Sequence, residues 1–265
     1  MKEPRTMKHD PLIGLAVVSP GSRDNIRRLF TTIKGPIDGA ALDFDHRKGD
    51  NPTVRESYEA AADWFGVGAS SIFVMRQVHG ADIAVIREPV DPSQTRAVVA
   101  ADGAVTDRVG QVLTVLTADC LPILMADPKR GVIAAVHAGW RSSVAGIAEK
   151  TVSLMNTVFG CEPADIFAAL GPAIGRCCFE VGPEVVAAVR ESFDFADDYL
   201  QIKAGGKGML DLAGLNRSVL TEAGLAAGAI WSADLCTYCR DDLFFSYRRQ
   251  GEGTGRMLAG IMIEE

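Results

Sequence analysis

Residues 116–141, LTADCLPILMADPKRGVIAAVHAGWR, contain two apolar runs that are joined by a short polar connection. The runs Leu121–Ala126 and Val132–Val136 have the length and composition of β-strands, and Asp127–Gly131 joins them. Asp, Pro and Gly in so short a connection are typical of a tight turn between antiparallel strands. The segment therefore predicts a β-hairpin, and this hairpin restricts the fold more than any other feature of the chain.

The hairpin carries a thiol at one end and an imidazole at the other. A turn centred on Pro128 and Lys129 would place Cys120 directly opposite His137, with Cβ atoms about 4.5–5.5 Å apart. That distance suits two ligands of one metal ion or a thiolate–imidazole pair, whereas a slip of one residue would separate them onto opposite faces. A lone cysteine is commonly a small buried apolar residue, but a buried histidine needs a polar partner. His79, in RQVHGAD, is a third candidate, and a glycine follows it that permits close approach.

The rest of the chain alternates strand-like and helical patterns without a regular βαβ order. We expect an α+β or layered α/β fold with mixed sheets flanked by helices, in one domain over residues 1–265, with residues 1–10 flexible. The expected helices span 53–66, 142–160, 183–193 and 212–224, and the other expected strands lie at 12–18, within 71–86 on both sides of His79, and at 111–118, 166–170, 244–249 and 256–263.

Polar residues mark where these helices begin. Thr53 followed by Glu56 has the pattern of a capping box, and Asp211 precedes the last expected helix. Ser142 or Ser143 is expected to cap the helix that follows the hairpin, and Gly160 to end it.

Charge and hydropathy limit the partners of the protein. A net charge of −7 and a pI of about 5.2 argue against binding to nucleic acid. No apolar run approaches the roughly 18 residues of a membrane span, and LIGLAVV near the N-terminus lacks a convincing cleavage site. We therefore expect a cytoplasmic protein that does not bind a membrane and keeps its six cysteines reduced. The sequence leaves its oligomeric state open.

Six motifs together resemble one protein family. They are RQVHGAD, ADGAVTD, LTADCLPILMAD, VHAGWR, LGPAIGRCCFEVGPEV and FFSYRR with TGR, in order between about Leu42 and Ile263. The chain is similar to the multicopper polyphenol oxidase family, whose laccase-domain members include YfiH/YlmD/FAMIN-like proteins. It departs from the family pattern at Asp43 and Asp45, where Asn and Gly are usual, and at Ser142, where Gly is usual.

The resemblance implies a YfiH-like fold and a zinc-dependent purine nucleoside phosphorylase with adenosine deaminase side activity. Its expected substrates are phosphate and adenosine, inosine or S-methyl-5′-thioadenosine. The family's metal ligands correspond to His79, Cys120 and His137, and two histidines with one cysteine leave an open position on a tetrahedral Zn²⁺ ion. Copper can occupy such a site singly, but four histidines are too few for the four coppers of a laccase.

Three further residues near these ligands are candidates for catalysis. Arg76 and Arg141 can each bind phosphate, because a guanidinium matches it bidentately, or can each form a structural ion pair. Asp119 can handle a proton, orient a ligand or cap a turn. Cys120 with His137 also suits a cysteine hydrolase, and a single copper would suit an oxidoreductase that acts on phenols.

Two other groups of residues allow both functional and structural interpretations. The cysteines at 177, 178, 236 and 239 can form a structural zinc site or a redox pair in an interaction module, although Cys177 and Cys178 are adjacent, and we take all four as structural. The arginines at 240, 248, 249 and 256 can reach a phosphate or face solvent.

Overall fold

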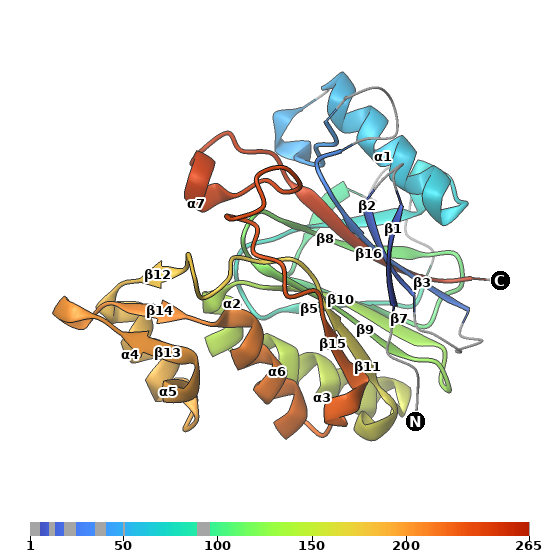
Figure 1. The fold of residues 1–265 in the computed structure, drawn as a ribbon. Coiled ribbons are helices and arrows are strands. Elements are labelled where there is room, and N and C mark those ends of the chain that lie inside the picture. The colour runs from blue at the N-terminus through green and yellow to red at the C-terminus, as the bar shows by residue number, and fades with distance from the viewer. Residues whose placement is uncertain are drawn as a thin grey trace.

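Two β-sheets packed face to face form the centre of the computed structural model, which describes residues 6–10, 14–18, 25–34, 41–49, 51–88 and 96–264 (Figure 1). The first sheet has seven strands: β1 (Thr6–Asp10), β2 (Gly14–Val18), β3 (Ile26–Thr31), β16 (Met257–Ile263), β8 (Val112–Thr117), β4 (Ile72–Arg76) and β6 (Arg96–Ala100), in this spatial order. The second has six: β15 (Ile230–Ser232), β11 (Phe167–Leu170), β9 (Leu121–Asp127), β10 (Val132–Ala138), β7 (Gly103–Thr106) and β5 (Ile83–Ile86).

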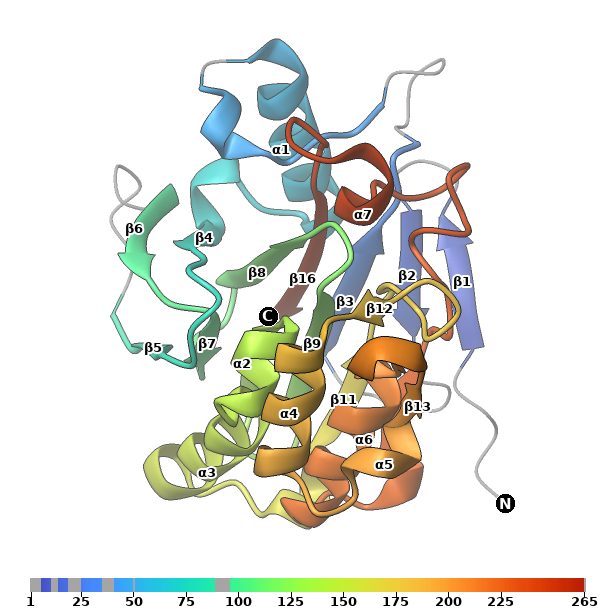
Figure 2. The same ribbon diagram turned by 90° about the vertical axis from the view of Figure 1, so that its left-hand side faces the viewer.

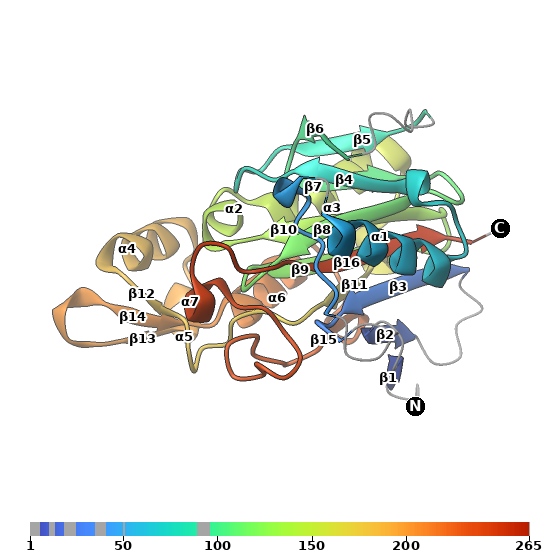
Figure 3. The ribbon, with the colours of Figure 1, turned by 90° about the horizontal axis from the view of Figure 1, so that it is seen from above.

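Helices cover the outer faces of both sheets. Helix α1 (Pro52–Phe65) lies on the seven-stranded sheet, and α2 (Trp140–Val144), α3 (Ile147–Phe159) and α6 (Leu212–Glu222) lie on the side of the six-stranded sheet (Figures 1 and 2). At one end, a small sheet with the order β12-β14-β13 projects beside two helices, as Figure 3 also shows from above. These elements are β12 (Glu180–Val181), β13 (Leu200–Ile202), β14 (Gly208–Leu210), α4 (Pro183–Ser192) and α5 (Ala196–Tyr199), and the short helix α7 (Tyr247–Gln250) lies nearby.

Successive side chains of each strand point to opposite faces of its sheet, and the apolar ones form three cores. In β9, Leu121 and Ile123 pack toward the helices, whereas Leu124 and Ala126 pack against the other sheet. A third core joins α1 to the outer face of the seven-stranded sheet. The molecule is therefore a single four-layered α/β/β/α domain, and the predicted fold class is confirmed. No helix in the described part of the chain is both long and apolar enough to cross a membrane.

The hairpin forms, but its register differs from the predicted one by two residues. His137 lies opposite Pro122, and the turn spans residues 128–131 because Asp127 accepts hydrogen bonds from the backbone N–H groups of Lys129 and Arg130. Cys120 is therefore not directly opposite His137. A shift by an even number of residues preserves the face of each side chain, so both still point to the same side of the sheet.

Several local predictions need correction. The helix expected over 142–160 is two helices, α2 and α3, which are separated at Gly146 (φ 77°), and Ser142 and Ser143 lie inside α2 instead of capping it. Asn51, not Thr53, caps α1 with its side chain. Residues 244–249 do not form a strand; residues 247–249 belong to α7, and Ser246 caps it.

Other local predictions agree with the structure. Asp211 caps α6 and Gly160 ends α3 in a left-handed conformation. Of the strand expected at 12–18, residues 14–18 form β2, while residues 12 and 13 lie outside the described residues. Strand β1 falls within the segment that we expected to be flexible, and residues 1–5 are not described.

A close contact between strand β11 and the other sheet leads to a stability prediction. A Cβ atom at Gly171 would lie 2.4 Å from the ring of Phe30, which stacks on Trp231 and is buried. Gly171→Ala should lower the free energy of unfolding by about 1–3 kcal/mol, because the ring must move in a packed core. Urea denaturation measures this change. Gly228→Ala is the matched control, since no atom lies within 4 Å of its added methyl group, and equal midpoints for the two variants would contradict the prediction.

Candidate metal centre

Three side chains from distant parts of the sequence meet at one end of the two sheets. His79 follows β4 of the seven-stranded sheet, Cys120 precedes β9, and His137 lies near the end of β10 in the six-stranded sheet. Each offers one ligand atom, and these atoms all lie within 4.8 Å of one another. The structure therefore brings together the three residues that the sequence singled out as metal ligands.

A buried carboxylate that the sequence analysis did not select organises two of these residues. Asp102 is fully buried and accepts hydrogen bonds from the backbone N–H groups of Val78, His79 and Gly80 at 2.8–3.0 Å. His79 has a left-handed backbone (φ 59°), which helps to turn the three N–H groups toward one anion. The Asp102 side chain also contacts Nδ1 of His137 at 2.8 Å. Asp102 thus fixes the position of one candidate ligand through its backbone and of another through its ring.

The contact with Asp102 also determines which nitrogen of His137 is available. With Nδ1 facing the carboxylate, Nε2 remains for a metal ion. The rings of His79 and His137 stand edge to face with centroids 4.9 Å apart. The only sequence indication of Asp102 was an acidic residue in the motif ADGAVTD, and nothing in its spacing revealed this contact.

The third candidate ligand sits in a turn that crosses from one sheet to the other. Residues 118–120 connect β8 to β9, and Asp119 has a strained positive φ of 94°. Its carboxylate accepts hydrogen bonds from Thr237 Oγ1 at 2.6 Å, Ser246 Oγ at 3.0 Å and the backbone N–H of Arg248 at 2.7 Å. These donors hold the turn that presents Cys120, which favours an orienting role for Asp119 over proton transfer.

The thiol and the imidazole shift each other's proton affinity. Burial opposes ionisation of Cys120, but the charge of His137 and hydrogen bonds from His137 and His79 outweigh it and lower the pKa of the thiol to about 6. Burial likewise opposes the charged form of His137, yet the Cys120 thiolate and the Asp102 carboxylate raise its pKa to about 9. The thiolate, which is the form that binds metals, is therefore the favoured state of Cys120 near neutral pH.

The residues present fit a zinc ion. Two imidazole nitrogens and one thiolate are donors that Zn²⁺ prefers, and their separations are compatible with three corners of a tetrahedron. A histidine whose other nitrogen contacts a carboxylate is a common arrangement at zinc sites. Gly139 leaves room for this cluster, because a Cβ atom there would lie 3.0 Å from Cys120 Sγ and 3.4 Å from His79 Cδ2.

The three candidate ligands line a cavity of about 780 Å³. Arginines dominate its charged lining, which contains Arg47, Arg76, Arg141, Arg248 and Arg256 together with Asp45 and Asp119. Apolar and aromatic side chains also line it, among them Phe179, Leu212 and Tyr247. The cavity can thus accommodate an anion and a flat apolar ring near the candidate metal centre.

The arginines selected from the sequence differ in their surroundings. Arg76 and Arg141 line the cavity, and neither forms an ion pair with another residue of the described ranges. The guanidinium of Arg141 lies over the ring of Trp140 at 4.3 Å. Both side chains therefore lie where a molecule in the cavity can contact them.

The four arginines near the C-terminus have separate roles. Arg248 and Arg256 line the cavity, whereas Arg249 donates to the backbone carbonyls of residues 237, 238 and 244 and is structural. Arg240 pairs with Asp242 on the surface. Only two members of this basic group can therefore contact a molecule in the cavity.

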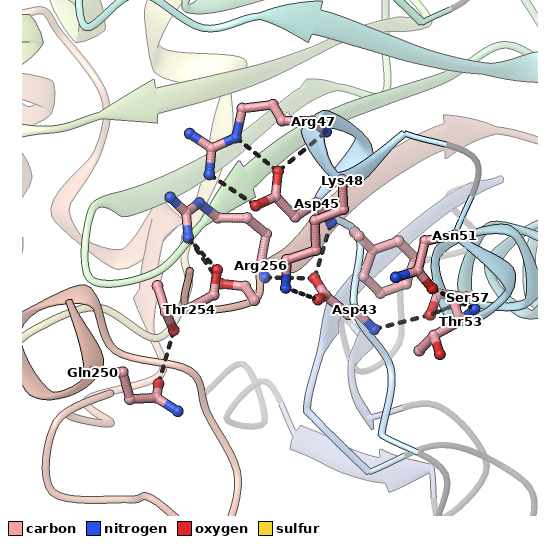
Figure 4. Close-up of polar contacts among 12 residues, drawn as sticks. Asp43, Asp45, Arg47, Lys48, Asn51, Thr53, Ser57, Gln250, Thr254 and Arg256 are labelled. Atoms are coloured by element: carbon pink, nitrogen blue, oxygen red, sulfur yellow. Dashed lines mark hydrogen bonds and ion pairs between the residues drawn. The ribbon is translucent and has the colours of Figure 1, made fainter. Parts of the chain in front are cut away.

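The two acidic departures from the family pattern hold basic residues through polar contacts (Figure 4), and Asp45, Arg47 and Arg256 line the cavity. Asp45 forms a bidentate ion pair with Arg47, with contacts of 2.7 and 2.8 Å. Asp43 contacts Lys48 at 2.6 Å and accepts a hydrogen bond from the backbone N–H of Arg256 at 2.9 Å. No feature of the sequence indicated that Asp45 lines the cavity or that Asp43 supports Arg256 there.

Ser142, the third departure, directly follows three residues of the cavity lining but does not itself belong to it. It is fully buried within α2 and is absent from the cavity lining among the described residues. A direct contact of its side chain with a molecule in the cavity is therefore not expected.

Two sheets that carry a His–Cys–His cluster beside an arginine-lined cavity define a layered α/β protein with a candidate metal centre at one end of its sheets. The chain belongs to the family described as multi-copper polyphenol oxidoreductase laccase, whose model matches residues 27–264.

Relatives with known names and structures are similar over most of the chain. Purine nucleoside phosphorylase YlmD of Geobacillus stearothermophilus is 36% identical over 234 residues, covering 86% of this chain and 85% of the relative. Adenosine deaminase RL5 from an unknown prokaryotic organism is 37% identical over 243 residues, covering 88% and 92%. The crystal structure of YfiH from Bacillus licheniformis has a TM-score of 0.89 at 30% identity and covers 97% of this chain and 99% of its own.

Proposed function

We propose that this protein is a zinc-dependent purine nucleoside phosphorylase with adenosine deaminase side activity. Its proposed substrates are phosphate and adenosine, inosine or S-methyl-5′-thioadenosine. The names of its relatives support this reaction class. The observation that carries the proposal is the position of His79, Cys120 and His137 on the wall of an arginine-rich cavity.

His79, Cys120 and His137 would hold the zinc ion, and Asp102 would keep His137 oriented. Bound zinc supplies a Lewis acid with one open coordination position, which suits both water activation and stabilisation of developing negative charge. The same donor set can also bind a single copper ion, so the metal content of the purified protein must be measured before activity is interpreted.

Arginines of the cavity would bind and orient phosphate. Phosphorolysis forms a bond between a phosphate oxygen and C1′ of the ribose while the C1′–N9 bond breaks and the purine leaves. Arg76 and Arg141 are suited to hold the phosphate, because each lines the cavity and neither has a carboxylate partner in the described ranges. Phe179 and Tyr247 offer aromatic surface on which a purine can stack.

This assignment predicts a selective effect of Arg141→Ala. The KM for phosphate should rise about tenfold, which corresponds to the loss of one charge-assisted hydrogen bond. Deamination of adenosine should change little, because in that reaction water attacks C6 of the purine, ammonia leaves and no phosphate takes part. Arg240→Ala is the matched control, since Arg240 pairs with Asp242 at the surface. An equal loss of both activities in Arg141→Ala would show that the arginine does not act on phosphate.

A cysteine hydrolase is the second candidate. The lowered pKa of Cys120 and its contact with His137 suit a nucleophilic thiolate as well as a metal ligand. Chelation separates the two functions: a zinc enzyme loses activity and regains it with added zinc, whereas a cysteine hydrolase keeps its activity in chelator and loses it on alkylation.

The deciding experiment incubates protein of known zinc content with adenosine, with and without phosphate, and separates the products by chromatography. Phosphate-dependent release of adenine would support a phosphorylase, and inosine formed without phosphate would identify chiefly a deaminase. No product from zinc-replete protein would overturn the purine proposal and favour the hydrolase.

A further inference from the structure

A second group of four thiols lies outside the cavity. Cys177 and Cys178 belong to the turn that precedes β12, and Cys236 and Cys239 lie between β15 and α7. The two segments run side by side, because Ala173 pairs with Cys236 in a parallel bridge. The fold thus joins cysteines that are about 60 residues apart, as the separation of 61 between Cys178 and Cys239 shows.

The spacing of the sulfur atoms matches a metal site better than a disulfide. Cys239 Sγ lies 3.4 Å from Cys178 Sγ and 3.7 Å from Cys177 Sγ, and all four sulfurs lie within 4.8 Å of one another. With zinc–sulfur bonds of about 2.3 Å, the sulfurs of a tetrahedral four-cysteine site are about 3.8 Å apart. A disulfide would need about 2.0 Å between two of the sulfurs, and it would involve only two of the four cysteines.

Backbone N–H groups donate hydrogen bonds to one sulfur of the cluster. The N–H of Gly175 donates to Cys236 Sγ at 3.3 Å, and the Cys239 backbone also donates to this sulfur. Gly175 also leaves space at the centre, because a Cβ atom there would lie 3.3 Å from Cys177 Sγ. The hydrogen-bond donors and the space left by Gly175 are therefore both compatible with a metal ion bound by these sulfurs.

We propose that Cys177, Cys178, Cys236 and Cys239 bind a second zinc ion, which has a structural role. Binding replaces the thiol protons by metal–sulfur bonds, so no oxidant or reductant is needed. Four protein ligands fill the tetrahedral positions and leave none for a substrate, which distinguishes this site from the His–Cys–His centre.

The proposed ion would connect the surface to the cavity wall. It joins the turn at 175–178 to the segment that contains Thr237, and Thr237 donates to Asp119 at 2.6 Å. Asp119 in turn holds the residues 118–120 that present Cys120. The second zinc would therefore keep one support of the first centre in place without contacting a substrate.

Metal analysis of the full chain tests this proposal. The protein, expressed with zinc in the medium and dialysed, should contain two zinc ions per chain by mass spectrometry of the metal. Cys239→Ser and Cys178→Ser should each lower the content to one, and Cys120→Ala should also retain one, now at the four-cysteine site. Cys161→Ala is the matched control, because Cys161 lies in neither cluster and should leave both ions bound.

Cobalt substitution identifies the ligands independently of activity. Cobalt added to metal-free Cys120→Ala protein should give the strong sulfur-to-cobalt charge-transfer absorption of a tetrahedral four-thiolate site, and Cys239→Ser should reduce it. Two results would overturn the proposal. The first is a wild-type content of one zinc per chain that is lost in Cys120→Ala. The second is a disulfide between two of these cysteines, seen as a mass lower by two hydrogens in fresh protein purified under reducing conditions. Neither result depends on whether the protein acts on purines.

Discussion

Replacement of Cys120 by alanine is expected to remove zinc from the His–Cys–His centre and to lower kcat/KM for adenosine phosphorolysis at least about 10³-fold. The thiolate is the only anionic donor in that set, and two neutral imidazoles hold Zn²⁺ far less well. Loss of a Lewis acid that contributes several kcal/mol to a transition state corresponds to a rate loss of this size. Metal content and steady-state kinetics on the same preparation measure both effects.

The control for this prediction is Cys161→Ala, which removes a buried thiol that is not among the described residues lining the cavity. It should keep normal kinetics and normal zinc at the His–Cys–His centre. Phosphorolysis at the wild-type rate by a Cys120→Ala protein would show that the centre does not serve the reaction. A loss of rate with no change in zinc would instead point to Cys120 as a nucleophile.

Asp102→Asn is expected to weaken zinc binding about 10- to 100-fold, the range typical of lost carboxylate partners of metal-bound histidines. An amide offers one acceptor oxygen, whereas the carboxylate uses both oxygens for three backbone N–H groups and His137. The histidine also loses the negative charge that makes its ring a stronger donor. Competition with a chromophoric chelator measures the affinity directly.

The positioning role of Asp102 predicts how the kinetic loss should behave. Much of the activity of Asp102→Asn should return at saturating zinc, which a residue in contact with substrate would not allow. Asp165→Asn is the control, because Asp165 pairs with Lys129 at the exposed end of the hairpin and should leave zinc affinity unchanged. Wild-type zinc affinity in a folded Asp102→Asn protein would contradict the role assigned to Asp102.

The candidate ligands could be predicted from sequence because their placement depends on a regular element. A two-stranded hairpin has a period of two residues, so an even error in register left Cys120 and His137 on the same face. His79 was selected because it lies in the motif RQVHGAD and is followed by a glycine that permits close approach. The layered fold followed from short apolar strands and amphipathic helices, and the alternation of side chains along β9 separates two of its three cores.

Asp102 was missed because its role depends on contacts between separate segments. Its three backbone donors lie 22–24 residues away, and their convergence needs the left-handed conformation of His79, which no sequence pattern indicated. The segment FFSYRR was misread for a related reason. Its alternation suggested a strand, but the side chain of Ser246 caps α7 and the Arg248 N–H binds the distant Asp119, and these contacts outweigh the local pattern.

A metal ion at the candidate centre would cross-link the two sheets, between which residues 118–120 cross. His79 extends from one sheet and His137 belongs to the other, so a shared metal ion would fasten the two halves of the sandwich at this end. An ion bound only by the closed sandwich stabilises it in proportion to the logarithm of the free metal concentration. The resistance of the chain to unfolding would then report how much metal its surroundings supply, and metal starvation would reduce the amount of folded protein together with its activity.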